Sequence, residues 1–260
     1  MSYCIPSYYP LHYSLTHSLT HSLTHSLTHS LIKRDNSIKY WEVASGFCIK
    51  TFTGHSDWVR CISISLNGDL LASGSSDQTI IVWNISSGTS VQVLRGHEHV
   101  IETLSFGKKP VLAADITRIL AETQNDKSNE SELCSYLVSG SRDKSIRLWD
   151  PLKGELLMSF NTHANWVRGV VLHPCGKYII SVSDDKSIKV IDVKQGNPLT
   201  HLTEVSYLLT HHLSSQGTCV KTISDAHEHF ITSLALSLQR PVLATASVDW
   251  KINIWDCSSS

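Results

Sequence analysis

The chain has 260 residues, enough for one large all-β domain or two domains of ordinary size. Its charged residues amount to 17% and its formal net charge is −1, which argues against a nucleic-acid-binding domain, because such domains carry a strong basic excess. No apolar stretch approaches 18 residues, no secretory signal is evident and the seven cysteines form no CxxC pair, so we expect a cytoplasmic protein with reduced thiols and no membrane span.

The first segment, residues 1–33, has low sequence complexity. Four copies of Ser-Leu-Thr-His follow one another from Ser14 to His29, and a four-residue period gives no sustained apolar face. We expect this segment either to be disordered or to be a gene-model artefact, translated simple-sequence DNA joined to a truncated gene. Histidine-rich metal binding is a third alternative. In each case we expect the folded domain to span residues 34–257.

A repeated motif begins at Arg34. Five segments place an aspartate six residues before a position that is tryptophan in four of them: Asp35–Trp41, Asp77–Trp83, Asp143–Trp149, Asp185–Ile191 and Asp249–Trp255. A histidine stands upstream of each of the last four aspartates, at separations of 22, 46, 22 and 22 residues. The underlying period is therefore 42 residues, with insertions at about 108–132 and 194–217.

Each complete copy of the repeat is predicted to form four short antiparallel strands. In the first copy these are Val59–Ile64, Leu70–Gly74, Thr79–Trp83 and Ser90–Leu94, separated by turns rich in Gly, Asn and Ser. One such sheet cannot bury both of its faces, so the copies must pack on one another. The predicted fold is all-β, a β-propeller fragment of four complete blades plus the end of a preceding blade. The insertion at 108–132 would join the first two strands of its blade.

Each complete copy also carries a hydroxyl residue four positions before its aspartate. With the histidine and tryptophan this gives a candidate hydrogen-bonded set, in which Asp accepts from His, His meets the hydroxyl and the hydroxyl meets the indole. The four sets are His55, Ser73, Asp77 and Trp83; His97, Ser139, Asp143 and Trp149; His163, Ser181 and Asp185; and His227, Thr245, Asp249 and Trp255. Ile191 replaces the tryptophan of the third set, so we expect Ser181 to lack its indole donor.

A His–Ser–Asp combination also invites a hydrolase interpretation. A catalytic triad needs one exposed nucleophile in one cleft, whereas this combination recurs in every copy and the chain has no Gly-x-Ser-x-Gly motif. We therefore expect a buried structural role and no enzymatic activity. His97/His99 and His227/His229 resemble paired zinc ligands, but the first histidine of each pair belongs to a polar set, so we expect no metal and no cofactor.

The recurring Gly-His and Trp-Asp positions resemble the WD-repeat β-propeller family. Four more specific strings resemble the lissencephaly-protein family of dynein regulators, which is also the non-catalytic subunit of platelet-activating-factor acetylhydrolase IB: Ile49–His55, Ser139–Ser145, Asn165–Val170 and Asp225–Phe230. The resemblance covers about residues 34–257, except 194–217. That family has a dimerisation motif, a coiled coil and a seven-bladed ring. The resemblance implies that this chain holds the last four blades and exposes an open radial edge.

The resemblance further implies a scaffold that binds the dynein motor domain through one propeller face. The matching positions are Arg34, Arg60, Arg142, Trp166 and Lys186. Their places in the repeat support this, because Arg142 directly precedes a set aspartate and Trp166 directly precedes a first strand at the same end of the blades. Arg and Trp are also enriched in binding hot spots. The alternative is that Trp166 packs on its own blade and the arginines are only solvated.

The implied processes are microtubule-based transport, nuclear migration and mitosis, in the cytoplasm, on the cytoskeleton and at the microtubule-organising centre. Acetylhydrolase catalytic subunits and other dynein adaptors are further partners that the resemblance implies, whereas nucleic acid and membranes are not expected. The alternative function is a generic WD-repeat adaptor, such as a substrate receptor of a ubiquitin ligase. That role would need an F-box or similar segment, and residues 1–33 contain none.

Overall fold

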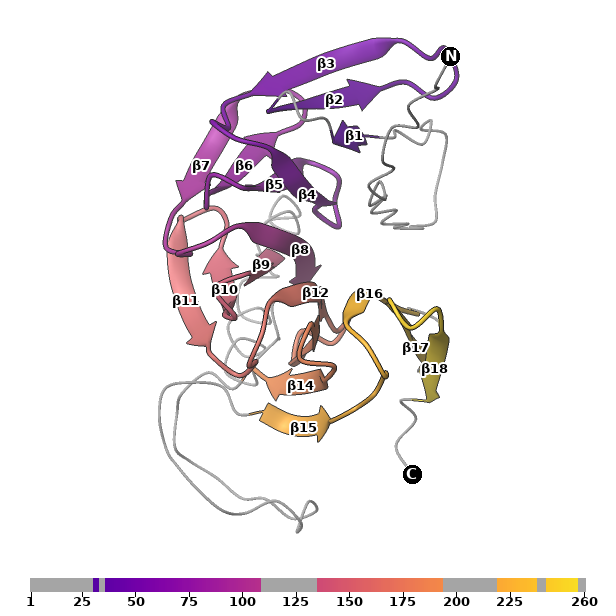
Figure 1. Ribbon diagram of the computed structural model, residues 1–260. Helices are drawn as coiled ribbons and strands as arrows, with labels where there is room; N and C mark the ends of the chain where they lie inside the picture. Colours follow the sequence, from indigo (N-terminus) through magenta and orange to yellow (C-terminus); the bar gives the residue numbers. More distant parts are fainter. Residues whose placement is uncertain (1–29, 33–35, 109–134, 194–218, 238–241, 257–260) are drawn as a thin grey trace, which may run out of the picture.

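The computed structural model describes residues 30–32, 36–108, 135–193, 219–237 and 242–256, which form five antiparallel β-sheets in an open arc (Figure 1). The first sheet contains β1 (Ser30–Ile32), β2 (Ser37–Trp41) and β3 (Cys48–Thr53). The second contains β4 (Val59–Ile64), β5 (Leu70–Ser75), β6 (Ile80–Asn84) and β7 (Ser90–Leu94). No helix of this part of the chain is long and apolar enough to cross a membrane.

The remaining three sheets repeat the same up-and-down order. The third contains β8 (Ile101–Lys108), β9 (Ser135–Ser141), β10 (Ile146–Asp150) and β11 (Glu155–Phe160). The fourth contains β12 (Val167–Leu172), β13 (Tyr178–Ser183), β14 (Ile188–Asp192) and β15 (Cys219–Ile223). The fifth contains β16 (Ile231–Leu236), β17 (Val242–Ser247) and β18 (Ile252–Asp256).

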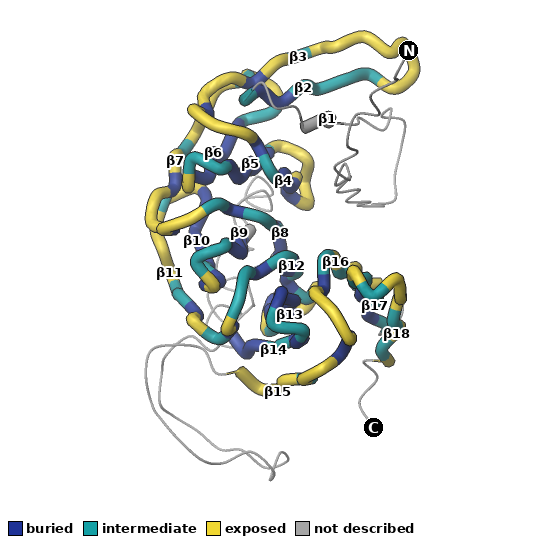
Figure 2. The backbone as a smooth tube through the Cα atoms, in the orientation of Figure 1, coloured by how far each residue is buried: buried dark blue, intermediate teal, exposed yellow. Residues whose placement is uncertain are grey.

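The position of a strand in its sheet sets its place in the arc. The first strands β4, β8, β12 and β16 line the concave side, and each contacts the next one along the chain (Figure 1). The last strands β3, β7, β11 and β15 form the outer edge, where most residues are exposed (Figure 2). The arrangement is the radial array of blades that the repeat predicts, and the all-β fold is confirmed.

The core consists of four apolar clusters, one at each seam between neighbouring sheets. At the seam between the second and third sheets, Ile80 and Val82 of β6 pack against Ile101 and Leu104 of β8. Burial of a side chain of this size stabilises the fold by about 1.5–3 kcal/mol. Because alternate residues of a strand face opposite sides, each inner sheet contributes to two seams at once.

The blade at the N-terminal end differs from the sequence prediction. Residues 1–33 were expected to lie outside the folded domain, but β1 pairs antiparallel with β2 and occupies the second-strand position of the first sheet. Pairing satisfies the backbone groups that would otherwise remain open along the edge of β2. The Ser-Leu-Thr-His copies lie outside the described residues, as does Arg34.

The register of β1 explains an unsatisfied group in the first sheet. Leu31 is opposite Lys39, as Ser73 of the second sheet is opposite Ile81, so a leucine stands at the hydroxyl position of the repeat. The indole nitrogen Nε1 of Trp41 is buried and has no hydrogen-bond partner among the described residues. Within the described residues, the first sheet therefore has the backbone pairing of a blade without a complete polar set.

The last sheet also differs from the prediction of a complete blade, because it has three strands in the described part of the chain. Ile252 and Ile254 of β18 are 71% and 65% exposed. Their counterparts Ile80 and Val82 in the second sheet are fully buried against the following sheet. The outward face of the last sheet is thus apolar and open, in keeping with the expected radial edge.

Both long insertions connect strands at the same end of their sheets. Residues 109–134 lie between β8 and β9, the first two strands of the third sheet, as predicted, and Lys108 is still paired with Ser135. Residues 194–218 lie between β14 and β15 of the fourth sheet. Asp192, at the end of β14, pairs with Tyr178 at the start of β13, so this connection is far from the β13–β14 turn.

Candidate partner-binding face

The four polar sets lie inside single sheets and are hydrogen-bonded throughout. In the second sheet, Nδ1 of His55 is 2.8 Å from Oδ2 of Asp77, and its Nε2 is 2.8 Å from Oγ of Ser73. The indole N–H of Trp83 donates to the same Oγ at 2.8 Å. The corresponding distances in the other sets fall between 2.7 and 2.9 Å.

The third set has no tryptophan and is one donor short. Ser181 contacts His163 at 2.8 Å and the carbonyl oxygen of Lys189 at 3.4 Å, and buried Ile191 occupies the tryptophan position. Every set histidine is buried and has both ring nitrogens bonded within its own sheet. Such rings are not available to activate an exposed nucleophile or to coordinate a metal.

Each set aspartate joins two connections at one end of its sheet. Oδ2 of Asp77 accepts from the backbone N–H of Ser56, before β4, while Oδ1 accepts from the backbone N–H of Thr79, in the β5–β6 turn. Burial disfavours the charged carboxylate, but hydrogen bonds from Thr79 and His55 outweigh it and lower the pKa of Asp77. The loop before the first strand and the turn after the second strand are therefore held together as one surface.

Backbone hydrogen bonds define equivalent positions on this surface. The N–H groups of Ser76, Arg142 and Asp184 donate to the carbonyl oxygens of Trp58, Val100 and Trp166, at 2.8, 3.0 and 3.0 Å. Two residues further along each first strand stand Arg60, Glu102 and Arg168. Charged side chains thus occupy matched places on three successive sheets, and a tryptophan stands two residues before the charged residue in two of them.

Glu102 connects these three sheets. Its Oε1 lies 3.1 Å from a guanidinium nitrogen of Arg60, is hydrogen-bonded by Nε of Arg142, and lies 3.7 Å from a guanidinium nitrogen of Arg168. The Glu102 side chain is only 12% exposed. Burial disfavours its ionised form, but the charge of Arg60 and the hydrogen bond from Arg142 prevail, so the pKa of Glu102 is lowered. The carboxylate is therefore ionised at neutral pH.

Trp166 lies against two of the arginines. The guanidinium carbon of Arg142 is 4.3 Å from the centroid of the indole ring, and that of Arg168 is 4.9 Å away. Both are cation–π distances. Arg168 also donates two hydrogen bonds to Asp184, of 2.9 and 2.8 Å, and these raise its pKa although burial opposes the charged form. Trp166 is thus held by charged neighbours and is half-buried.

An open pocket of about 280 Å³ adjoins this network between the second and third sheets. Its walls include Trp58, Arg60, Val100 and Arg142. Trp58 is 40% exposed, so the pocket offers an aromatic surface beside two guanidinium groups. Together, Arg60, Glu102, Arg142, Trp166, Arg168 and Asp184 form what we call the arginine–tryptophan face, with this pocket at its side.

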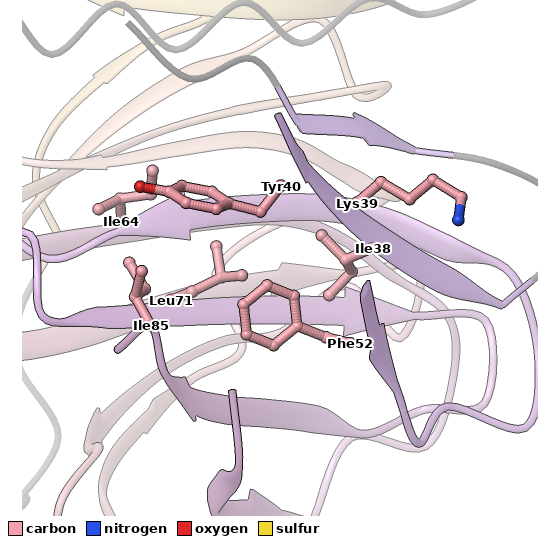
Figure 3. A pocket seen from close by; sticks show the side chains of 7 residues that line it. All are labelled: Ile38, Lys39, Tyr40, Phe52, Ile64, Leu71 and Ile85. Atoms are coloured by element: carbon pink, nitrogen blue, oxygen red, sulfur yellow. The ribbon is translucent and has the colours of Figure 1, made fainter. Parts of the chain in front are cut away.

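A second pocket has a different character. It measures about 10 Å³ and lies between the first and second sheets, where Ile38, Tyr40, Phe52 and Leu71 approach one another (Figure 3). These residues belong to the apolar cluster of that seam or pack against it. The pocket is a small packing gap in the apolar core.

The structure brings together three of the five predicted partner-binding residues: Arg60, Arg142 and Trp166. Lys186 lies in the β13–β14 turn at the same end of the sheet, but the ion pairs of the described residues do not include it. Sequence reasoning missed Glu102 and Arg168. Aligning the first strands would have revealed them, because the position two residues after Trp58, Val100 and Trp166 is charged in all three copies.

Comparison with known proteins identifies the repeat. The family model described as WD domain, G-beta repeat matches residues 46–84, 131–150, 154–192 and 217–256, which together are more than half of the chain. Three of the four matches run from the last strand of one sheet to the third strand of the next. The matches thus contain the complete polar sets of the second, fourth and fifth sheets, and Ser139, Asp143 and Trp149 of the third.

Several curated relatives share a name that refers to the nucleus. The chain is 36% identical to nuclear distribution protein PAC1 of Coccidioides posadasii over 201 residues, which are 77% of this chain and 38% of that protein. It is 37% identical to nuclear distribution protein nudF of Emericella nidulans over 202 residues, 77% of this chain and 40% of that protein. Identity to the Yarrowia lipolytica PAC1 protein is 36%, over 81% of this chain and 42% of the relative. The chain therefore spans about two-fifths of these relatives.

Proposed function

Because this chain belongs to the WD-repeat family, we propose that it is a non-catalytic protein-interaction scaffold that regulates cytoplasmic dynein through its arginine–tryptophan face. The relatives are named for nuclear distribution, and the strings Asn165–Val170 and Ser139–Ser145 resemble those of dynein regulators. The proposed setting is microtubule-based transport, nuclear migration and mitosis, in the cytoplasm and at the microtubule-organising centre.

One observation carries the proposal: three sheets contribute charged side chains to a single interlocked group around Trp166. Interface hot spots are enriched in Trp and Arg, and they lie in pre-organised places where little side-chain freedom is lost on binding. Arg142 and Trp166 fit that description, because each already contacts the other. Lys186, in the neighbouring turn, is proposed to contribute at the margin of the same face.

The proposal assigns no chemistry to the polar sets. Their serines and histidines are buried and bonded to one another, so they support the fold and do not act on a substrate. Acetylhydrolase catalytic subunits and other dynein adaptors are additional proposed partners on the strength of the family resemblance. A ubiquitin-ligase receptor has no supporting observation in the described residues.

The test is a titration of the full-length protein with recombinant dynein motor domain. Truncating a hot-spot side chain costs about 2 kcal/mol or more, so Arg142→Ala and Trp166→Ala should each weaken binding by about 30-fold. Neither substitution removes a residue of the apolar seams, so the thermal unfolding midpoint should change little.

Two control variants lie in the β10–β11 connection, at the opposite end of the third sheet. Lys153→Ala removes one exposed positive charge, and Leu152→Ala removes an exposed apolar side chain. Both should bind dynein as the unchanged protein does. Unchanged affinity in Arg142→Ala and Trp166→Ala, with folding intact, would show that this face does not bind the motor.

A further inference from the structure

We propose that Glu102 is a positioning residue, which fixes three arginines of neighbouring sheets and so presets the arginine–tryptophan face for an acidic surface on its partner. The inference rests on the proposed function as far as the partner is concerned. The structural half of the inference is that Glu102 fixes the three arginines. It concerns only this chain and can be tested without any partner.

The geometry makes Glu102 the centre of the group. It lies on β8, the first strand of the third sheet, whereas Arg60 comes from β4 of the second sheet and Arg168 from β12 of the fourth. Arg142 comes from the β9–β10 turn of the same sheet as Glu102. All three guanidinium groups approach the single oxygen Oε1. One carboxylate thus links three sheets at the concave side of the arc.

Glu102 also controls the environment of Trp166 indirectly. Arg142 and Arg168 both contact the carboxylate of Glu102 and both lie over the indole ring. Asp184 holds only one of them, Arg168. Without Glu102, three like charges would face one another and Arg142 would regain the rotamer freedom of a long side chain. The contact between Arg142 and Trp166 would then loosen.

The charge of the face indicates the kind of partner surface. Arg60, Arg142 and Arg168 carry three positive charges, and Glu102 and Asp184 carry two negative charges, so the group keeps an excess of one positive charge. Arg60 and Arg142 also border the open pocket, where they are two of the three charged lining residues and Asp57 is the third. Their planar guanidinium groups suit carboxylates, which they can bind through paired hydrogen bonds. We therefore expect aspartate or glutamate side chains of the partner to dock here.

Positioning and simple charge make opposite predictions for Glu102→Gln. Removing a negative charge makes the face more positive, so charge attraction alone would strengthen binding to an acidic surface and speed association. If Glu102 positions the arginines, binding should instead weaken, by about tenfold, mainly through faster dissociation. Glu98→Gln is the matched control, since it removes the same charge from an exposed residue at the same end of the third sheet. It should not weaken binding.

A double-mutant cycle separates positioning from general destabilisation. If Glu102 acts through Arg142, then Glu102→Gln should cause a much smaller loss of affinity when Arg142 is already alanine. A loss of the same size in both backgrounds would overturn the assignment. Thermal melts of all variants would establish that the folded fraction is the same.

Nuclear magnetic resonance tests the structural half without a partner. In the full chain, the side-chain Nε–Hε signals of Arg142 and Arg168 can be assigned with Arg142→Lys and Arg168→Lys. The ring current of Trp166 should displace these signals, and the displacement should shrink in Glu102→Gln but persist in Glu98→Gln. Unchanged signals in Glu102→Gln would overturn the inference even if dynein binds this face. If the displacement is lost in Glu102→Gln but the unchanged protein does not bind dynein, only the proposed function would be overturned.

Discussion

At the scale of single residues, each polar set works as an ordered chain of hydrogen bonds. With the imidazole neutral, Nδ1–H of His55 donates to Asp77 and Nε2 accepts the hydroxyl proton of Ser73, whose oxygen in turn accepts the indole N–H of Trp83. Each side-chain polar group of this set then has a hydrogen-bond partner. In the second set, burial lowers the pKa of His97 and so favours the neutral imidazole, although the hydrogen bond to Asp143 and the charge of Asp143 act in the opposite direction.

The missing tryptophan of the third set gives a matched pair of substitutions. Ser73→Ala leaves two buried groups without a partner, Nε2 of His55 and the indole N–H of Trp83, whereas Ser181→Ala leaves only Nε2 of His163. An unsatisfied buried group costs about 1–3 kcal/mol, so Ser73→Ala should lower the free energy of unfolding by about 1 kcal/mol more than Ser181→Ala. Urea unfolding of the two variants measures this difference. Equal losses would mean that the indole bond contributes nothing to stability.

Sequence could predict contacts within a repeat better than contacts between repeats. The fixed distance from His to Asp identifies residues that meet inside one sheet, and the hydrogen bonds lie where that spacing places them. The contact of Glu102 with Arg60 and Arg168 joins three different copies. A spacing within one copy carries no information on which side chains meet across a seam. The spacing within single repeats could therefore not predict that Glu102 lies at the centre of the arginine–tryptophan face.

At the scale of elements, the set aspartates fix the turns between second and third strands. Oδ2 of Asp185 accepts from His163 and from the N–H of Ala164, while Oδ1 accepts from the N–H and the hydroxyl of Ser187. Four donors thus converge on one carboxylate. Burial opposes its ionised form, but the hydrogen bonds from His163 and Ser187 prevail and hold the pKa of Asp185 well below its ordinary value.

Because the pKa of Asp185 is lowered in the folded state, the free energy of unfolding should depend on pH. A carboxylate whose pKa is depressed in the folded state stabilises that state above the unfolded pKa of about 3.9, and the stabilisation is lost as the pH falls below that value toward the folded pKa. In Asp185→Asn an amide N–H₂ faces two of the four donors, so the variant should be less stable at pH 7 by about 2 kcal/mol or more. The free energies of unfolding of the unchanged chain and of Asp185→Asn should be measured from pH 7 to pH 3. The difference between them should become smaller below about pH 4. A gap that stays constant would contradict the role of the charge.

The strands themselves were largely readable from the sequence. The strands predicted for the first complete copy agree with β4 to β7 within one residue at each end, because alternating apolar residues and glycine- or serine-rich turns mark them clearly. β1 could not be predicted, since its three residues continue a low-complexity run and carry neither turn signals nor a set hydroxyl. Only its pairing with β2 places it in the sheet.

At the scale of the whole molecule, the arc has one strongly apolar open face. Four seams are closed by neighbouring sheets, but the face of the last sheet that carries Ile252 and Ile254 has no sheet against it in the described residues. Apolar surface of this kind tends to be buried by association. If this face meets the same face of a second copy, the contact closes at a dimer, whereas contact with the opposite end of a second copy is head-to-tail and can continue to longer assemblies.

We therefore expect concentration-dependent self-association of the 260-residue chain. Ile252→Thr with Ile254→Thr should reduce it, because two exposed apolar side chains are replaced by polar residues that suit strands. Val91→Thr with Val93→Thr is the control, since these valines are 40% and 43% exposed on the outer strand β7. Sedimentation velocity over a range of concentrations measures the effect. Equal association of the two double variants would exclude the face of β18 as its cause.

The two long insertions enter the third and fourth sheets at the ends of β8 and β14, on the side away from Arg142 and Asp184. Lys108 and Ser135 remain paired across the first of them, so the sheet is complete up to the point where the extra chain leaves it. Length can therefore vary there without disturbing the residues that face a partner. The same positions are therefore suitable insertion sites for a fluorescent reporter or an affinity tag, because such an insertion leaves the arginine–tryptophan face accessible during single-molecule recording.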